Sequence, residues 1–85
     1  MPLFSFTLTV EGADILSEDA LNALYEAGCH DATFGASNGV QTAEFDREAP
    51  EFAEAVGSAI RAIENAVPGA VVVRIRRDAD VAAEG

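Results

Sequence analysis

Large apolar residues alternate with small polar residues at the start of the chain, and the apolar period then changes along the sequence. From Leu3 to Val10 the period is two, which predicts a β-strand with one face buried in a core. The side chains expected to point into that core are Phe4, Phe6, Leu8 and Val10.

A helical period follows this strand. Ser17 is expected to cap a helix whose first turn holds Glu18 and Asp19, where the helix dipole favours negative charge. Apolar side chains recur at helical spacing as far as Ala27. Gly28 is expected to end the helix in the left-handed conformation, which carries no steric penalty for glycine.

Two strands joined by a tight turn come next, from residue 31 to 36 and from residue 40 to 46. The connecting residues 37–39 include Asn-Gly, which is a strong hairpin signal. We choose the phase that keeps Glu44 out of the core, because a buried unpaired charge is costly. The inward residues are then Ala32, Phe34, Gln41, Ala43 and Phe45.

The rest of the chain predicts a second helix and a fourth strand. Pro50 suits the first helical position, and Pro68 with Gly69 stops the helix, so it is expected over residues 50–67. Its apolar stripe is Phe52, Val56, Ile60, Ile63 and Val67. The fourth strand is expected over residues 70–77, with Val71, Val73 and Ile75 facing inward.

This order of elements predicts an α+β domain of the ferredoxin-like βαββαβ type. We expect a two-layer sandwich, in which an antiparallel sheet of order 4-1-3-2 has both helices on one face. Residues 1–77 are expected to form a single domain, and residues 78–85 a C-terminal tail or truncated linker.

The helix-free face of this sheet is the main candidate surface. It is predicted to carry Ser5, Thr7, Thr9, Thr42, Glu44, Val72, Arg74 and Arg76. One interpretation is plain exposure to solvent, and the other is docking of a second copy or an adjoining domain. The candidate interaction residues are Thr7, Thr9, Thr42, Arg74 and Arg76. The edge of the fourth strand is a second candidate for self-association, unless its arginines guard it.

Charge narrows the classes of partner. The 85 residues carry a net charge of −10, with fifteen acidic residues against five arginines. Such a surface repels nucleic-acid phosphates and anionic membranes, so we expect no direct contact with either. The simplest interpretation of the acidity is solubility, with a basic partner or a halophilic or high-GC bacterial source as alternatives. The single cysteine, Cys29, and the absence of a signal-peptide pattern fit a cytoplasmic protein.

No catalytic or metal-binding pattern is found in the sequence. Cys29, His30 and Asp31 are consecutive, so their side chains alternate and do not converge. We expect Cys29 to be a small buried apolar residue. Asp46 and Arg47 are placed in a loop before the second helix, where they form either a local ion-pair cluster or a binding hinge. We therefore predict no enzyme activity, cofactor or metal.

Gly57 lies inside the second predicted helix, where glycine is unfavourable by ~1 kcal/mol relative to alanine. A Gly57→Ala substitution is expected to stabilise the fold if Gly57 faces solvent. It is expected to destabilise the fold if Gly57 faces the first helix.

Four segments resemble the N-terminal domain of a group of bacterial helix-turn-helix DNA-binding regulators. They are EAGCHDA (residues 26–32), FDREA (45–49), EAVGSAI (54–60) and VVR (72–74). The resemblance covers most of residues 3–76 and implies a small domain that precedes a helix-turn-helix. That DNA-binding part is absent from this chain, so no DNA-contacting residue is carried over.

The preferred hypothesis is a non-enzymatic interaction or oligomerisation domain, forming a homodimer, of a bacterial transcription-regulator-like or antitoxin-like protein. A downstream helix-turn-helix domain in a longer protein would be a further partner. The alternative is a small-molecule-sensing regulatory domain that binds an effector at a subunit interface, which is an argument from fold analogy.

Overall fold

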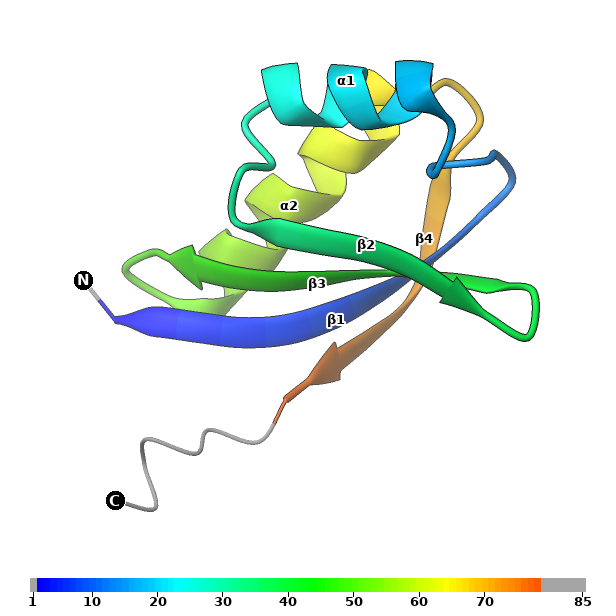
Figure 1. The fold of residues 1–85 in the computed structure, drawn as a ribbon. Helices are drawn as coiled ribbons and strands as arrows, with labels where there is room; N and C mark the ends of the chain where they lie inside the picture. The colour runs from blue at the N-terminus through cyan, green and yellow to red at the C-terminus, as the bar shows by residue number, and fades with distance from the viewer. Residues whose placement is uncertain (1, 79–85) are drawn as a thin grey trace.

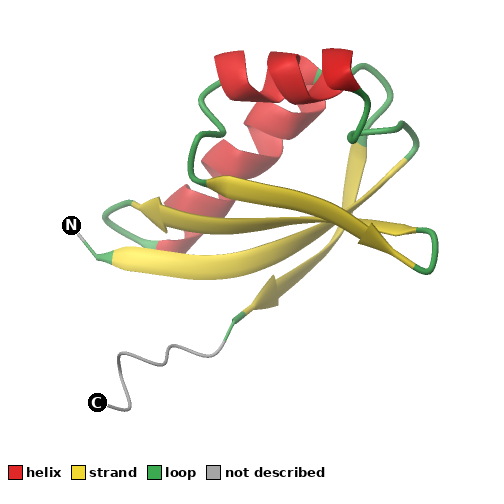
Figure 2. Ribbon diagram, in the orientation of Figure 1, coloured by secondary structure: helices red, strands yellow, loops and turns green. Residues whose placement is uncertain are grey.

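Two helices and four strands make up the computed structural model, which describes residues 2–78. The elements are β1 (Leu3–Glu11), α1 (Glu18–Glu26), β2 (Ala32–Ser37), β3 (Val40–Glu48), α2 (Phe52–Ala66) and β4 (Val71–Arg77). Both helices lie on the same side of the sheet, as Figures 1 and 2 show. The predicted α+β class, with a four-stranded antiparallel sheet and two helices, is confirmed.

The first strand lies in the interior of the sheet. The order across the sheet is β2-β3-β1-β4, which is 4-1-3-2 when read from the β4 edge. Strand β1 pairs antiparallel with β3 on one side and with β4 on the other. Strands β2 and β4 are therefore the two edges.

Local sequence signals explain most element boundaries. The Ser17 hydroxyl accepts a hydrogen bond from the Ala20 amide at 3.2 Å, which caps α1 as predicted. Gly28, with a φ of 97°, follows the end of α1. Asn38 and Gly39 both have positive φ in the turn between β2 and β3, which is the geometry of a tight hairpin.

The connection between β3 and α2 differs from the prediction. Strand β3 extends to Glu48 because it continues to pair with the start of β1, where Leu3 lies opposite Glu48. Helix α2 then begins at Phe52 rather than at Pro50, since the residue before it, Glu51, is still extended. Asp46 and Arg47 consequently lie in a strand, so their predicted position in a loop is wrong.

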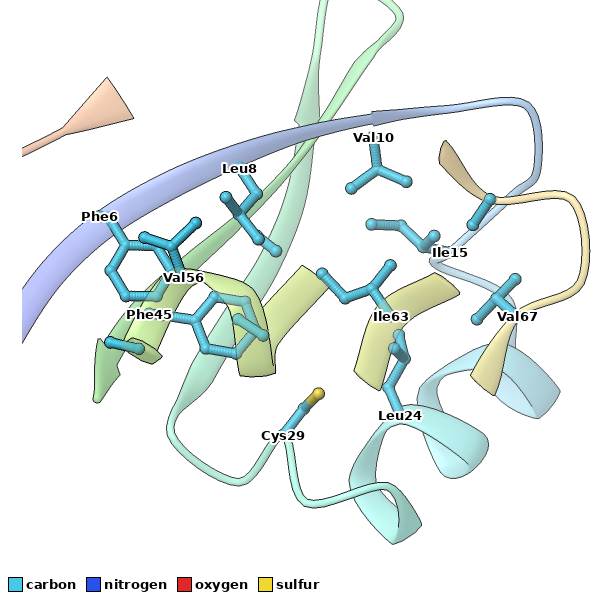
Figure 3. Close-up of a cluster of buried hydrophobic side chains, with 14 of the residues drawn as sticks. Phe6, Leu8, Val10, Ile15, Leu24, Cys29, Phe45, Val56, Ile63 and Val67 are labelled. Atoms are coloured by element: carbon cyan, nitrogen blue, oxygen red, sulfur yellow. The ribbon is translucent and has the colours of Figure 1, made fainter. Parts of the chain in front are cut away.

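The core fills the space between the sheet and the helices. Its largest fully buried side chains are Phe6, Phe45, Leu8, Ile15, Leu24, Ile63 and Val10, and Figure 3 shows how they gather from both layers. The rings of Phe6 and Phe45 stack with centroids 5.4 Å apart, and the Phe52 ring meets Phe6 edge-on at 5.8 Å. Cys29 is 3% exposed within this cluster, as expected for a small apolar residue.

Gln41 is the polar residue that was predicted to face inward, and it organises the β1–α1 loop. Its side-chain oxygen accepts a hydrogen bond from the Ile15 amide at 2.8 Å. Its side-chain nitrogen donates to the carbonyl oxygens of Ala13 at 2.7 Å and Val10 at 3.4 Å. The amide therefore holds the loop so that Ile15 can be fully buried.

The predicted inward phase of β4 is wrong for its valines. Val71 and Val73 are each 50% exposed, whereas Val72 is partly buried and packs against the core. The register shifts between Thr9 and Val10, which pair with Arg74 and Val72, so Val73 is an extra residue. A β-bulge of this kind reverses which residues face each side. Val72, which was predicted on the helix-free face, therefore lies on the core side.

Ile75 behaves differently from the valines. It lies opposite Leu8 and so on the core side, but it remains 48% exposed at the edge of the sheet.

The start of the predicted tail belongs to the sheet region. The Asp78 amide donates to the Ser5 carbonyl at 3.1 Å, which continues the pairing of β4 with β1. The other residues of the predicted tail, 79–85, lie outside the described residues. Within residues 2–78, neither helix has the length and apolar character needed to cross a membrane.

Candidate functional site

The helix-free side of the sheet, named here the open face, brings the candidate interaction residues together. Strand register places Thr7 between Glu44 and Arg76, and it places Thr9 between Thr42 and Arg74. The five residues predicted from the sequence, Thr7, Thr9, Thr42, Arg74 and Arg76, thus occupy two adjacent rows that run across β3, β1 and β4. Their role in binding remains a prediction.

Most charges on the open face are grouped by strand, although the carboxylate of Asp78 lies beside the arginines of β4. Strand β3 contributes the carboxylates of Glu44, Asp46 and Glu48 to this face. Strand β4 contributes the guanidinium groups of Arg74 and Arg76. Adjacent strands are about 4.8 Å apart, so these acidic and basic columns are separated by about 10 Å. The column of β1 lies between them, with the uncharged Ser5, Thr7 and Thr9 followed by the exposed carboxylate of Glu11 at its end.

The hydroxyl groups of that central column are already hydrogen-bonded. Thr7, which is only 7% exposed, donates its hydroxyl hydrogen toward the two oxygens of Asp78, at 3.1 and 3.2 Å. Ser5 donates to a carboxylate oxygen of Asp46. Arg76 also pairs with Asp78 at 3.2 Å, but its side chain remains 71% exposed. The two hydroxyls therefore orient carboxylates, and the Arg76 side chain is accessible for further contacts.

Half-exposed valines occupy one end of the open face. Val40 is 47% exposed, and the bulge in β4 places Val71 and Val73 on the same face at 50% each. Val40 and Val73 line a hollow of about 260 Å³ together with Thr9, Glu11 and Arg74. Sequence reasoning missed this apolar end, because the bulge that creates it depends on pairing between β1 and β4.

Arg47 forms a second polar cluster, on the helix side of the sheet. Its Nε and Nη2 atoms donate to the two oxygens of Asp31, both at 2.9 Å. Its Nη1 donates to the Ser58 hydroxyl at 3.0 Å, and Nη2 also donates to the Gly28 carbonyl at 3.1 Å. The cation lies 5.0 Å from the centre of the Phe45 ring. Arg47 thus links β3 to α2 and to the connection between α1 and β2.

This cluster shifts the ionisation of its members. Burial raises the pKa of the Asp31 carboxyl, but the hydrogen bonds and positive charge of Arg47 outweigh it and bring the pKa below its ordinary value. Burial also raises the pKa of the Cys29 thiol, with Arg47 acting in the opposite direction. Asp31 is therefore ionised at neutral pH, while Cys29 remains a protonated thiol.

A hollow of about 590 Å³ lies beside this cluster, with Asp31, Asp46, Arg47 and Glu48 in its wall. Four of the five N–H groups of Arg47 already donate within the protein. Three carboxylates in the same wall disfavour an anionic ligand. The Arg47–Asp31 ion pair therefore holds the wall of this hollow together. The hollow does not have the character of an anion-binding site.

The candidate chemistry around His30 does not converge. The His30 ring stacks on Tyr25 with centroids 4.0 Å apart, and its Nε2 lies 2.7 Å from the Tyr25 carbonyl oxygen. Asp46 faces the open face, whereas Arg47 faces the helix side. Within residues 2–78 no group of three or more His, Cys, Asp or Glu side chains is placed to hold a metal ion.

Comparison with known proteins gives no relative: no family model, no curated protein and no solved structure matches this chain. The resemblance to helix-turn-helix regulators remains a prediction from the quoted segments.

Proposed function

We propose that this chain is a non-enzymatic interaction domain that self-associates. The supporting observation is the open face, which no helix covers and which combines exposed valines with carboxylates on β3 and arginines on β4. A face that contacts only solvent would gain no stability from three half-exposed valines at one end. Apolar side chains rimmed by polar groups are typical of protein contact surfaces.

The polar groups of this domain favour binding over chemistry. The Thr7 and Ser5 hydroxyls and the Arg47 guanidinium are engaged by carboxylates of the same chain. The two hydroxyls contact carboxylates only, without the oriented histidine or amine that activates a hydroxyl nucleophile. We therefore assign the domain to the interaction class, within a bacterial regulator-like or antitoxin-like protein, as the resemblance implies.

Sedimentation velocity over a wide range of protein concentration tests this proposal. We expect a concentration-dependent shift from monomer to dimer. A Val73→Asp substitution on the open face should weaken self-association. A Leu21→Asp substitution on α1, where the side chain is 37% exposed, should leave self-association unchanged. A chain that stays monomeric at every concentration would contradict the proposal. A large rise in melting temperature on adding a small metabolite would instead favour effector sensing.

A further inference from the structure

We propose that Asn38 is a site of spontaneous deamidation, and that the folded turn between β2 and β3 holds this reaction back until the hairpin opens. The inference concerns a chemical modification of a single chain, so it does not depend on self-association. It rests on the residue that follows Asn38, on the exposure of the turn and on its backbone geometry.

The reaction needs only the chain and water. The backbone nitrogen of Gly39 attacks the side-chain carbonyl carbon of Asn38 and gives up its proton to solvent. The side-chain amide group takes up a proton and leaves as ammonia, so a five-membered succinimide ring forms. Water then adds to one of the two ring carbonyls and breaks its bond to nitrogen, which gives either aspartate or isoaspartate.

The sequence distinguishes Asn38 from the other two asparagines of the chain. It is followed by Gly39, which has no Cβ to hinder the approach of its nitrogen to the side chain. Asn22 and Asn65 are also exposed, but each precedes an alanine and lies within a helix. They are therefore internal controls in which exposure is present and the glycine is absent.

The turn is open to solvent. Residues 37–40 are all exposed, and a Cβ added at Gly39 would meet no atom within 4 Å. Figure 1 shows the turn projecting from the end of the sheet, away from both helices. Water and hydroxide can therefore reach the Asn38 amide, and they can also reach the succinimide once it has formed.

The backbone of the folded turn opposes ring closure. Asn38 has a φ of 55° and Gly39 a φ of 79°, as in a type I′ turn, whose first central residue has a ψ of about +30°. At that ψ the Gly39 nitrogen lies nearly opposite the Asn38 Cβ about the Cα–C bond, whereas the ring requires both atoms on the same side. Pairing of Ser37 with Val40 maintains this geometry. The reaction therefore requires the end of the hairpin to open.

Strand β2 is held less firmly at this end than at the other. It lies at the edge of the sheet and pairs only with β3. At its start, Arg47 contacts Asp31 at 2.9 Å and the Asp46 amide donates to the Asp31 carbonyl at 3.1 Å. Next to the turn, Ala36 and Ser37 are exposed. Segments with few buried contacts open locally at a lower free energy than the whole domain.

The two products have different consequences for the hairpin. Aspartate keeps the normal backbone, and Asp-Gly also suits a type I′ turn, so this product should retain the fold with one more negative charge. Isoaspartate carries the main chain through the former side-chain carbon and so lengthens the two-residue turn. We expect faster amide exchange at Ser37 and Val40 in the isoaspartate form, while the Asp31 end of β2 stays protected.

Incubation in mildly alkaline buffer, with and without guanidinium chloride, tests the proposal. Peptide mapping by mass spectrometry follows each asparagine, with fragmentation that distinguishes aspartate from isoaspartate. Asn38 should convert readily in the unfolded chain and at least about tenfold more slowly in the folded chain. Asn22 and Asn65 should remain unmodified over the same period.

A matched pair of substitutions tests whether local opening controls the rate. Ala36→Gly weakens β2 beside the turn and should speed conversion of the folded chain by about threefold, since glycine in a strand costs roughly 0.5–1 kcal/mol. Ala62→Gly makes the same change in α2 and should lower overall stability without changing the rate. Both variants should match the original chain in guanidinium chloride, and circular dichroism checks that each is folded in buffer.

The outcomes are distinct. Conversion restricted to Asn38, slow in the folded chain and faster only in Ala36→Gly, supports the proposal. An Asn38 that stays intact in guanidinium chloride overturns the modification site. Equal rates in the folded and unfolded chains overturn the protective role of the turn. Equal acceleration by Ala36→Gly and Ala62→Gly overturns local opening, because it would show that the whole domain must unfold.

Discussion

The ion pair between Arg47 and Asp31 is expected to be the most important polar contact for stability. An Arg47→Met substitution keeps most of the apolar stem over Phe45 but removes the charge and all four hydrogen bonds. The Asp31 carboxylate and the Gly28 carbonyl then lose their partner. The Ser58 hydroxyl keeps its own bond to the Ala55 carbonyl at 3.0 Å.

The size of the loss follows from burial. Removing one partner of a fully buried ion pair costs about 3–5 kcal/mol. The Arg47 side chain is 14% exposed, but Asp31 is 30% exposed, so water replaces part of what Asp31 loses. Hydrogen bonds to charged groups contribute about 1.5–3 kcal/mol. We expect Arg47→Met to lower the free energy of unfolding by about 2 kcal/mol, a large share of the ~5–15 kcal/mol typical of a domain.

Urea denaturation followed by circular dichroism measures this loss, and a double-mutant cycle with Asp31→Asn isolates the pair. We expect a coupling energy of about 1–2 kcal/mol between the two substitutions. A coupling energy no larger than the few tenths of a kcal/mol typical of exposed pairs would refute the reasoning. It would mean that the geometry of this ion pair contributes little.

The effect of pH gives an independent check. The pKa of Asp31 is lower in the folded chain than its ordinary value of 3.8 in the unfolded chain. Its contribution to stability is therefore fully present above that value and is lost as the pH falls through the folded pKa. The gap in unfolding free energy between the original chain and Arg47→Met should narrow below about pH 4. A gap that stays constant down to strongly acidic pH would contradict this linkage.

Three further substitutions have defined outcomes in thermal melts. Gly57→Ala should raise stability by about 1 kcal/mol, because the added Cβ meets only the mobile end of Arg61, at 3.3 Å, and not α1. A destabilised variant would show that the space around Gly57 on α2 cannot accommodate the added Cβ. Gly12→Ala should lower stability by about 2 kcal/mol or more, because φ is +91° and the Cβ would collide with the Gly69 carbonyl oxygen. An unchanged melting temperature would be inconsistent with that close backbone approach. Gln41→Leu should cost about 1–3 kcal/mol and speed amide exchange in the β1–α1 loop; protection unchanged from the original chain would rule out this role of the amide.

The elements of the fold could be predicted because their signals are local. The apolar alternation in β1, the Ser17 cap and the Asn38-Gly39 turn each act within a few residues, and the structure places all three as expected. The inward position of Gln41 also followed from alternation. Its hydrogen-bond partners in the β1–α1 loop did not, because no local pattern connects residues so far apart in the sequence.

The errors share one physical cause, which is long-range strand pairing. The valines of β4 were assigned by strict alternation, but the bulge opposite Thr9 and Val10 reversed their phase. Asp46 and Arg47 were assigned to a loop, but pairing with β1 kept them in a strand.

The sequence contained a signal from which Asp31 could have been predicted as the partner of Arg47. Counting outward from the two-residue turn at Asn38-Gly39 brings Asp46 next to Asp31, and the Asp46 amide does donate to the Asp31 carbonyl. Such counting would have named Asp31 as the nearest carboxylate to Arg47, in place of a neighbour in sequence.

The interior position of β1 has a consequence for how the chain is made. On the ribosome β1 emerges first, yet both of its neighbours in the sheet, β3 and β4, emerge after other elements. The β2–β3 hairpin can close early because its contacts are local, whereas β1 must wait with an unpaired edge until β4 has left the exit tunnel. A stalled nascent chain that ends before Val71 should therefore be sensitive to protease and recruit chaperones, and protection should arise in one step when β4 becomes available.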